Sequence, residues 1–185
     1  LNFRYRFNKR SNLRINYRGT TTQPGMSDLL SIVDDSDPLN IKVGNPGLKP
    51  AFTNRLRLFY NTYIQSHQRS IMTYLNYSNT RNSISNKVTY DETTGGRTTQ
   101  PENINGNWNV NAAVMFNTSV DSAGVWNINT FTTGGYNHYV SFLSLDKKSD
   151  SQKNVTRSMN IGERLSGSYR NSWLEFELDG SLNYT

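Results

Sequence analysis

Apolar and polar residues alternate along nearly the whole chain, and this period of two constrains the fold more than any other feature. Near the start, Phe3, Tyr5 and Phe7 alternate with Asn and Arg, and further on Trp108 and Val110 alternate with Asn. Successive side chains of a β-strand point to opposite faces, so each such segment has one apolar and one strongly polar face. The pattern predicts an all-β chain of about eight antiparallel, up-and-down strands. They are expected near residues 1–8, 13–18, 56–60, 71–77, 108–116, 126–129, 155–169 and 174–184.

Composition argues against disorder and against a spanning helix. Only 34% of the residues are hydrophobic and 18% are charged, yet aromatic residues reach 12%. A disordered chain would have few aromatics and little patterning. No run approaches the roughly 18–20 apolar residues that a membrane-spanning helix needs, whereas a spanning strand needs only about 9–11 residues, of which half face away from lipid. The absence of cysteine excludes disulfides and thiolate metal sites, and the net charge of +6 favours anionic partners.

The connections between the predicted strands alternate between short and long. Short turns are predicted near residues 8–12, 66–69, 121–124 and 170–172, and long loops near 20–52, 85–103 and 137–154. In an up-and-down sheet alternate connections lie at opposite ends, so one end carries tight turns and the other carries all the long loops. This asymmetry is typical of transmembrane β-barrels.

Strand length and aromatic placement also favour a barrel. The predicted strands reach about ten residues, beyond the usual soluble length of about five or six. Aromatic residues recur towards strand ends, as in interfacial girdles. These residues are Tyr17, Tyr60, Tyr77, Tyr169, Trp173 and Tyr184. A soluble or surface-attached β-sandwich, acting as a binding or adhesion module, remains open as an alternative, and so does a self-contained eight-stranded barrel.

Residues 1–185 are therefore interpreted as part of an outer-membrane β-barrel domain. Both ends of the chain resemble the interior of a strand, so we expect further strands outside it. We expect no catalytic activity, since no Ser-His-Asp arrangement, phosphate-binding glycine loop or dinucleotide fingerprint is present.

A proline- and glycine-rich segment stands just before the third predicted strand. It comprises Asp37, Pro38, Leu39 and Asn40, followed by the structural loop motif Gly44, Asn45, Pro46, Gly47, Leu48, Lys49 and Pro50. Such residues fix the backbone and block ladder pairing, so the long loop should re-enter the sheet at a defined position.

The order of these motifs resembles the outer-membrane β-barrel family of Bacteroidetes-type TonB-dependent receptors. The resemblance is clearest over residues 13–60, where Tyr17-Arg18-Gly19 and Gln23-Pro24 precede the segment. Gly47 and Ala51 depart from the acidic residues expected there. The resemblance implies a barrel of about 22 strands in the bacterial outer membrane, an upstream plug domain and TonB-binding segment, and import of a bulky ligand. Outer-membrane lipid, the plug and the TonB system are the implied partners, and the sequence leaves a surface lipoprotein open.

Six arginines share the polar parity of three predicted strands. They are Arg4, Arg6, Arg14, Arg18, Arg55 and Arg57. A single-stranded nucleic-acid platform would carry stacking rings on the same face, whereas here the rings fall mostly on the other parity. We therefore expect these arginines to face the barrel lumen and to contact acidic plug residues or an anionic ligand, with no nucleic-acid partner.

No cofactor or metal site is predicted. His67 is expected in a tight turn and His138 in a long loop, both solvated, because neither has a second ligand at metal-binding spacing. The run Asp34-Asp35-Ser36-Asp37 lacks the glycine and distal glutamate of a calcium loop, so an acidic loop tip is favoured over a surface divalent ion. Glu175 and Glu177 share one strand face, and polar lumen lining is favoured over a carboxylate pair for sugar cleavage.

Overall fold

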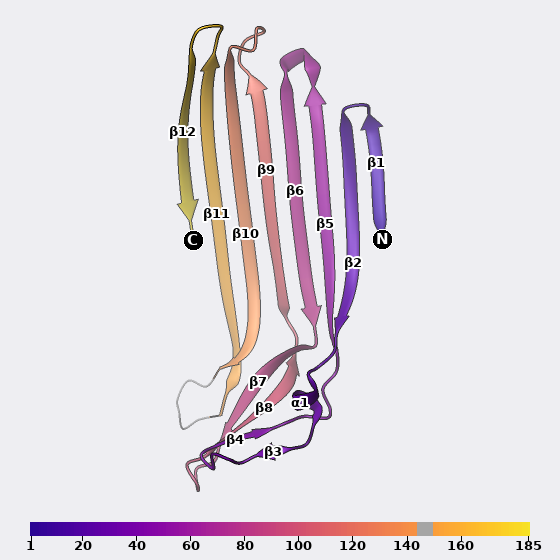
Figure 1. The fold of residues 1–185 in the computed structure, drawn as a ribbon, viewed down its shortest axis with the longest axis vertical. Helices are drawn as coiled ribbons and strands as arrows, with labels where there is room; N and C mark the ends of the chain where they lie inside the picture. Colours follow the sequence, from indigo (N-terminus) through magenta and orange to yellow (C-terminus); the bar gives the residue numbers. More distant parts are fainter. Residues whose placement is uncertain (144–149) are drawn as a thin grey trace.

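A single antiparallel sheet of eight strands dominates the fold. The computed structural model describes residues 1–143 and 150–185. In spatial order the strands are β1 (Asn2–Asn8), β2 (Ser11–Thr22), β5 (Ala51–Ile64), β6 (Arg69–Arg81), β9 (Asn107–Ser119), β10 (Trp126–Leu143), β11 (Gln152–Arg170) and β12 (Glu175–Tyr184). Each strand pairs with its neighbours in the order in which the main-sheet strands follow along the chain (Figure 1). The predicted all-β, up-and-down fold is confirmed. Strands β1 and β12 are the two edges and do not pair with each other, so the sheet does not close on itself as a self-contained eight-stranded barrel would.

A second, smaller sheet lies at the end of the large sheet that carries the long connections (Figure 1). It has the order β3 (Val33–Asp34), β4 (Asn40–Val43), β8 (Arg97–Ile104) and β7 (Ser83–Tyr90), with β4 and β8 parallel. The four-residue helix α1 (Met26–Leu29) precedes it, and the 3-10 turn η1 (Gln65–His67) joins β5 to β6 at the opposite end. Within the described part of the chain no helix has the length and apolarity to cross a membrane.

The prediction of long loops at three places is therefore partly wrong. The first and second loops, 20–52 and 85–103, build the small sheet. Each loop forms a pair of antiparallel strands, β3 with β4 and β7 with β8, and the parallel pairing of β4 with β8 joins the two pairs. The third predicted loop, 137–154, overlaps the long strands β10 and β11, which extend to Leu143 and from Gln152; residues 144–149 lie outside the described residues. Sequence reasoning missed these strands because β3 and β4 span only two and four residues and β8 carries mostly polar residues on both faces.

The large sheet has one apolar and one polar face, as predicted. The registers bring Leu13, Tyr60 and Val114 into one cross-strand row on the apolar face, and Arg14 and Phe59 into the adjacent row on the polar face. No second sheet covers the apolar face among the described residues. Within residues 1–143 and 150–185, the buried hydrophobic side chains are Leu48, Ile104 and Val140, and they lie where the small sheet meets the large one. A β-sandwich would bury that apolar face, so the sandwich alternative is wrong.

Two clusters of aromatic rings mark the ends of the apolar face. At the tight-turn end Trp126 packs on Tyr169, with ring centroids 4.7 Å apart. At the other end Trp108 stacks on Tyr136 at 5.2 Å and lies 6.3 Å from Tyr77. Tyr136 follows Trp126 by ten positions on β10, which is about 33 Å along a strand and about 25 Å of depth at a tilt near 40°. This depth equals the apolar band of a membrane barrel.

Candidate functional site

The six predicted arginines come together on the polar face of β1, β2 and β5. The register places Arg4 directly opposite Arg14, and Arg18 directly opposite Arg55. Arg6 lies opposite Asn12 and Arg57 opposite Asn16, so all six occupy consecutive rows of one face. All six side chains are exposed. The sequence prediction that they share a face is confirmed.

This arrangement leaves positive charge uncompensated. Like charges placed directly across two strands destabilise their pairing by up to about 1 kcal/mol, and two such pairs are present. None of the six arginines forms an ion pair with another described residue. Arg4, Arg6 and Arg14 surround a hollow of about 410 Å³. The buried side-chain oxygens of Asn12 and Asn61 beside it accept no hydrogen bond from the described residues. The cluster therefore presents uncompensated positive charge, which attracts anions.

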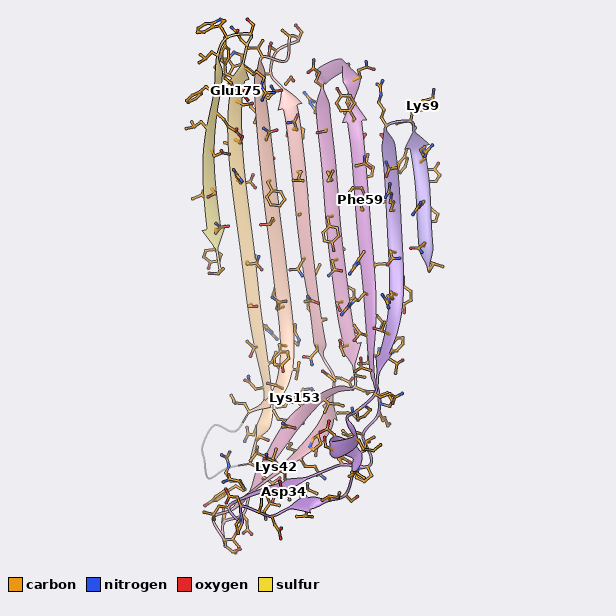
Figure 2. All side chains as sticks on the ribbon, in the orientation of Figure 1. Lys9, Asp34, Lys42, Phe59, Lys153 and Glu175 are labelled. Carbon is orange, nitrogen blue, oxygen red and sulfur yellow. The ribbon has the colours of Figure 1, made fainter. Side chains whose placement is uncertain are left out.

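The acidic residues of the polar face are, by contrast, already paired at the other edge of the sheet. Arg164 Nη2 lies 3.2 Å from Asp179 Oδ1, and Arg170 pairs with Glu175. Ser166 donates a hydrogen bond of 3.1 Å to Glu177. Glu175 lies near the tight-turn end of β12 (Figure 2). Glu175 and Glu177 do share one face, as expected, and each carboxylate has a partner of its own.

An apolar patch interrupts the polar face, and sequence reasoning missed it. Its members are Phe59, Met72, Tyr74, Met115 and Phe131, from β5, β6, β9 and β10. Figure 2 shows Phe59 partway along β5. Met72, Met115 and Phe131 line a hollow of about 560 Å³ that Arg164 and Asp179 border. The available signal was a break in alternation, with three large apolar residues in succession at 58–60 and 114–116.

The arginine cluster adjoins this patch. The Arg14 guanidinium carbon lies 5.9 Å from the centre of the Phe59 ring, within the range of a cation–π contact. Most rings of the large sheet lie on the opposite face, as expected, and Phe59 and Tyr74 are exceptions that lie on the arginine face. The polar face thus offers a basic surface beside an aromatic one.

The Gly44–Pro50 motif lies between β4 and β5, as predicted for a re-entry turn. A Cβ on Gly44 would stand 1.9 Å from the Leu30 carbonyl oxygen, so only glycine fits. The Asn45 amide nitrogen donates a 2.6 Å hydrogen bond to Asp28, and its side chain donates to Pro101 at 3.0 Å. Leu48 is buried.

The same motif joins the first long connection to the second. Asn103 accepts a hydrogen bond from the Lys49 amide at 2.7 Å and donates to the carbonyls of Lys49 and Asn82, both at 2.9 Å. Pro46 and Pro50 donate no amide hydrogen bond, which ends β4 and starts β5 cleanly. Pro38 lies upstream, where the Asp37 carboxylate accepts hydrogen bonds from Asn40 and Leu39. The motif therefore acts structurally by fixing the small sheet on the large one.

The family of the chain follows from a comparison over its full length. All residues, 1–185, match the outer membrane protein beta-barrel family. The chain belongs to this family. No curated protein and no solved structure shows a significant match.

Membership of the outer membrane protein beta-barrel family places the chain in the bacterial outer membrane. A barrel wall turns its apolar face to lipid and its polar face to the lumen, so the apolar face between the two aromatic clusters is the one expected to face lipid. The tight turns are at one membrane surface and the small sheet is at the other.

The histidines of this family member differ in part from expectation. His67 lies in the turn η1, as predicted. His138 lies in strand β10 and not in a loop, and it is half-buried. Its ring stacks on Trp108 at 5.7 Å, and its Nδ1 lies 2.8 Å from the Gly106 carbonyl oxygen. These contacts make His138 a structural member of the aromatic cluster around Trp108.

The acidic run at 34–37 caps turns. Ser36 donates its hydroxyl and its amide to Asp34, which lowers the pKa of that carboxyl, and the Asn40 side chain lowers the pKa of Asp37. Both carboxylates thus have local donors. In the described ranges no three His, Asp or Glu side chains gather as a metal site would require.

Proposed function

We propose that this barrel segment forms wall and extracellular loops of a TonB-dependent receptor of the Bacteroidetes type, which imports a bulky ligand. The observation that carries the proposal is the uncompensated arginine cluster on the lumen face beside the aromatic patch. An empty water-filled pore would gain nothing from two directly opposed arginine pairs, whereas an acidic partner inside the barrel would stabilise them.

The partner of the arginine cluster is, in this proposal, the receptor's own plug domain or an anionic ligand passing it. Membership of the barrel family supports the assignment of this segment to a barrel wall. The sequence motif at residues 37–50 supports the assignment of that barrel to a TonB-dependent receptor of the Bacteroidetes type. The small sheet supports the ligand-gathering role, because it stands over the end of the wall that bears the long connections (Figure 1). The chain acts by binding and conducting, without catalysis or a cofactor.

Charge reversal at one arginine of each opposed pair tests the lumen role. Arg4→Glu with Arg55→Glu converts both like-charged pairs into opposite-charged ones, so the wall itself should fold at least as well as before. In planar bilayers the purified full-length protein should be nearly closed, and the double variant should conduct ions because acidic plug residues are repelled.

A matched control reverses two lysines outside the cluster. Lys9→Glu with Lys153→Glu makes the same change of net charge at the two ends of the sheet (Figure 2). This variant should stay closed. Equal conductance in both double variants would refute a role for the arginines. Failure of the full-length protein to bind the purified periplasmic domain of the host's TonB would refute the receptor assignment.

A further inference from the structure

One charged side chain lies in the lipid-facing middle of the wall. Glu163 on β11 shares the apolar face with Ile161 and Leu165, and its cross-strand partners are Thr132 and Leu182. Thr132 stands six positions from Trp126 and six from His138 along β10, midway between the aromatic clusters. The cross-strand rows of this face that pass through Thr130, Thr132, Gly134 and Tyr136 of β10 consist of described residues, and they hold no other charged residue.

Glu163 has no partner within the described part of the wall. It takes part in none of the ion pairs or side-chain hydrogen bonds there. The nearby Arg164 points to the lumen, where it pairs with Asp179. A carboxyl group in the hydrocarbon layer is costly unless a donor satisfies it, and ionisable residues at such depth usually mark a contact. A donor from outside this wall therefore has to reach Glu163.

The surface around Glu163 is hollowed by glycines. Above Gly134, Gly167 and Gly180 the space that a Cβ would occupy has no atom within 4 Å. On the lumen face, in contrast, a Cβ on Gly162 would meet Asn183 and Thr133 at 2.7 Å. Gly167 and Gly180 form the floor of a hollow of about 480 Å³. Small residues on a lipid-facing surface allow another backbone to approach closely.

We infer that a second copy of the barrel packs against this face, with Glu163 of each copy accepting a hydrogen bond from Thr132 of the other. Thr132 and Glu163 are direct cross-strand neighbours. A two-fold axis along the membrane normal, between β10 and β11, therefore brings each carboxyl group near the threonine hydroxyl of the other copy at similar depth. Such an isologous contact needs donor and acceptor on one patch, and this patch supplies both. Bulky neighbours such as Ile128 then face glycine hollows across the interface.

Cross-linking in native outer membranes tests the contact with the full-length protein. This segment has no cysteine, so Thr130→Cys adds one defined site close to the proposed axis. Thr130 lies one row from Thr132 on the same face of β10, and the substitution leaves the Thr132 hydroxyl in place. A short, membrane-permeant bis-maleimide should give a covalent species of twice the monomer mass. Leu58→Cys is the matched control: it lies on the same face, in the middle of β5, three strands away in the sheet order, and should stay monomeric.

The role of Glu163 is tested on the Thr130→Cys background, which keeps both Thr132 and Glu163. Glu163→Leu should lower the yield of covalent dimer by about tenfold or more, since hydrogen bonds to a charged group are lost on both sides of the axis. The folded fraction, read from the heat-dependent shift on gels, should not fall, because leucine suits lipid. Gly167→Trp, which fills the hollow from a position with open space, should also reduce the dimer and serves if Glu163→Leu fails to fold.

Three results would overturn the inference. They are the absence of a Thr130→Cys cross-link, a cross-linked species of another mass, and an undiminished dimer in both Glu163→Leu and Gly167→Trp. A species of another mass would assign the face to a different membrane protein. The inference depends on the barrel wall alone, so it stands or falls independently of ligand import.

Discussion

Replacing Gly44 with alanine should release the small sheet from the barrel wall. The new Cβ would stand 1.9 Å from the Leu30 carbonyl oxygen and 3.1 Å from that of Asp28, although real Cβ contacts are almost never under 3.0 Å. The backbone must therefore separate by at least about 1 Å, and overpacking of this kind costs about 1–3 kcal/mol. The movement also breaks the 2.6 Å bond from Asn45 to Asp28, which costs about 1 kcal/mol more.

The total of about 2–4 kcal/mol should appear as local opening rather than global unfolding. Hydrogen exchange of the detergent-solubilised full-length protein measures it directly. Since 1.4 kcal/mol corresponds to a factor of ten, the Asn45 amide should exchange about 30-fold to several hundred-fold faster in Gly44→Ala. The amide of Thr132, in the middle of the large sheet, should be unchanged.

The control for this prediction is Gly47→Ala in the same motif. Its Cβ would meet only the Asn45 side-chain oxygen, at 3.1 Å, and a small rotation of that side chain relieves the contact. Its exchange should stay near that of the unmodified protein. Equal protection of Asn45 in the two variants would refute the claim that close approach to Leu30 requires glycine at position 44.

Three further predictions concern the small sheet and the aromatic cluster. Asn103→Ala removes one acceptor and two donor bonds and should destabilise the junction by about 1–3 kcal/mol, seen as faster proteolysis between β4 and β5. The pKa of Asp91 is lowered from 3.8 to about 2, chiefly by the Thr93 hydroxyl. The stabilisation that the ionised Asp91 carboxylate gives to the turn between β7 and β8 is therefore complete above about pH 4 and is lost as the pH falls through 2. Carboxyl chemical shifts should show this titration midpoint, and Thr93→Val should raise the midpoint towards 3.8. Trp108→Ala removes the indole that stacks on both Tyr136 and His138 and should lower barrel stability by about 1–3 kcal/mol in denaturant titrations; an unchanged midpoint would contradict the cluster's anchoring role.

Local periodicity was sufficient for much of the wall. Alternation placed the arginines and the apolar side chains on opposite faces because a strand's side chains follow a period of two whatever lies next to it. The order of short and long connections gave the up-and-down topology for the same reason, since it depends only on neighbouring strands. The position of the Gly44–Pro50 turn was also readable, because proline and glycine restrict the backbone locally.

Register and distant pairing were decided only by the tertiary structure. Arg18 faces Arg55 only because β2 and β5 align at one register across a long connection, and a shift of a single residue would reverse every face. The parallel pairing of β4 with β8 joins segments more than 50 residues apart, and nothing in either segment identifies the other as its partner. The sequence alone shows that residue 163 is a glutamate. Its depth between Trp126 and His138 follows only from the pairing of β10, β11 and β12, and so does its position beside the glycines.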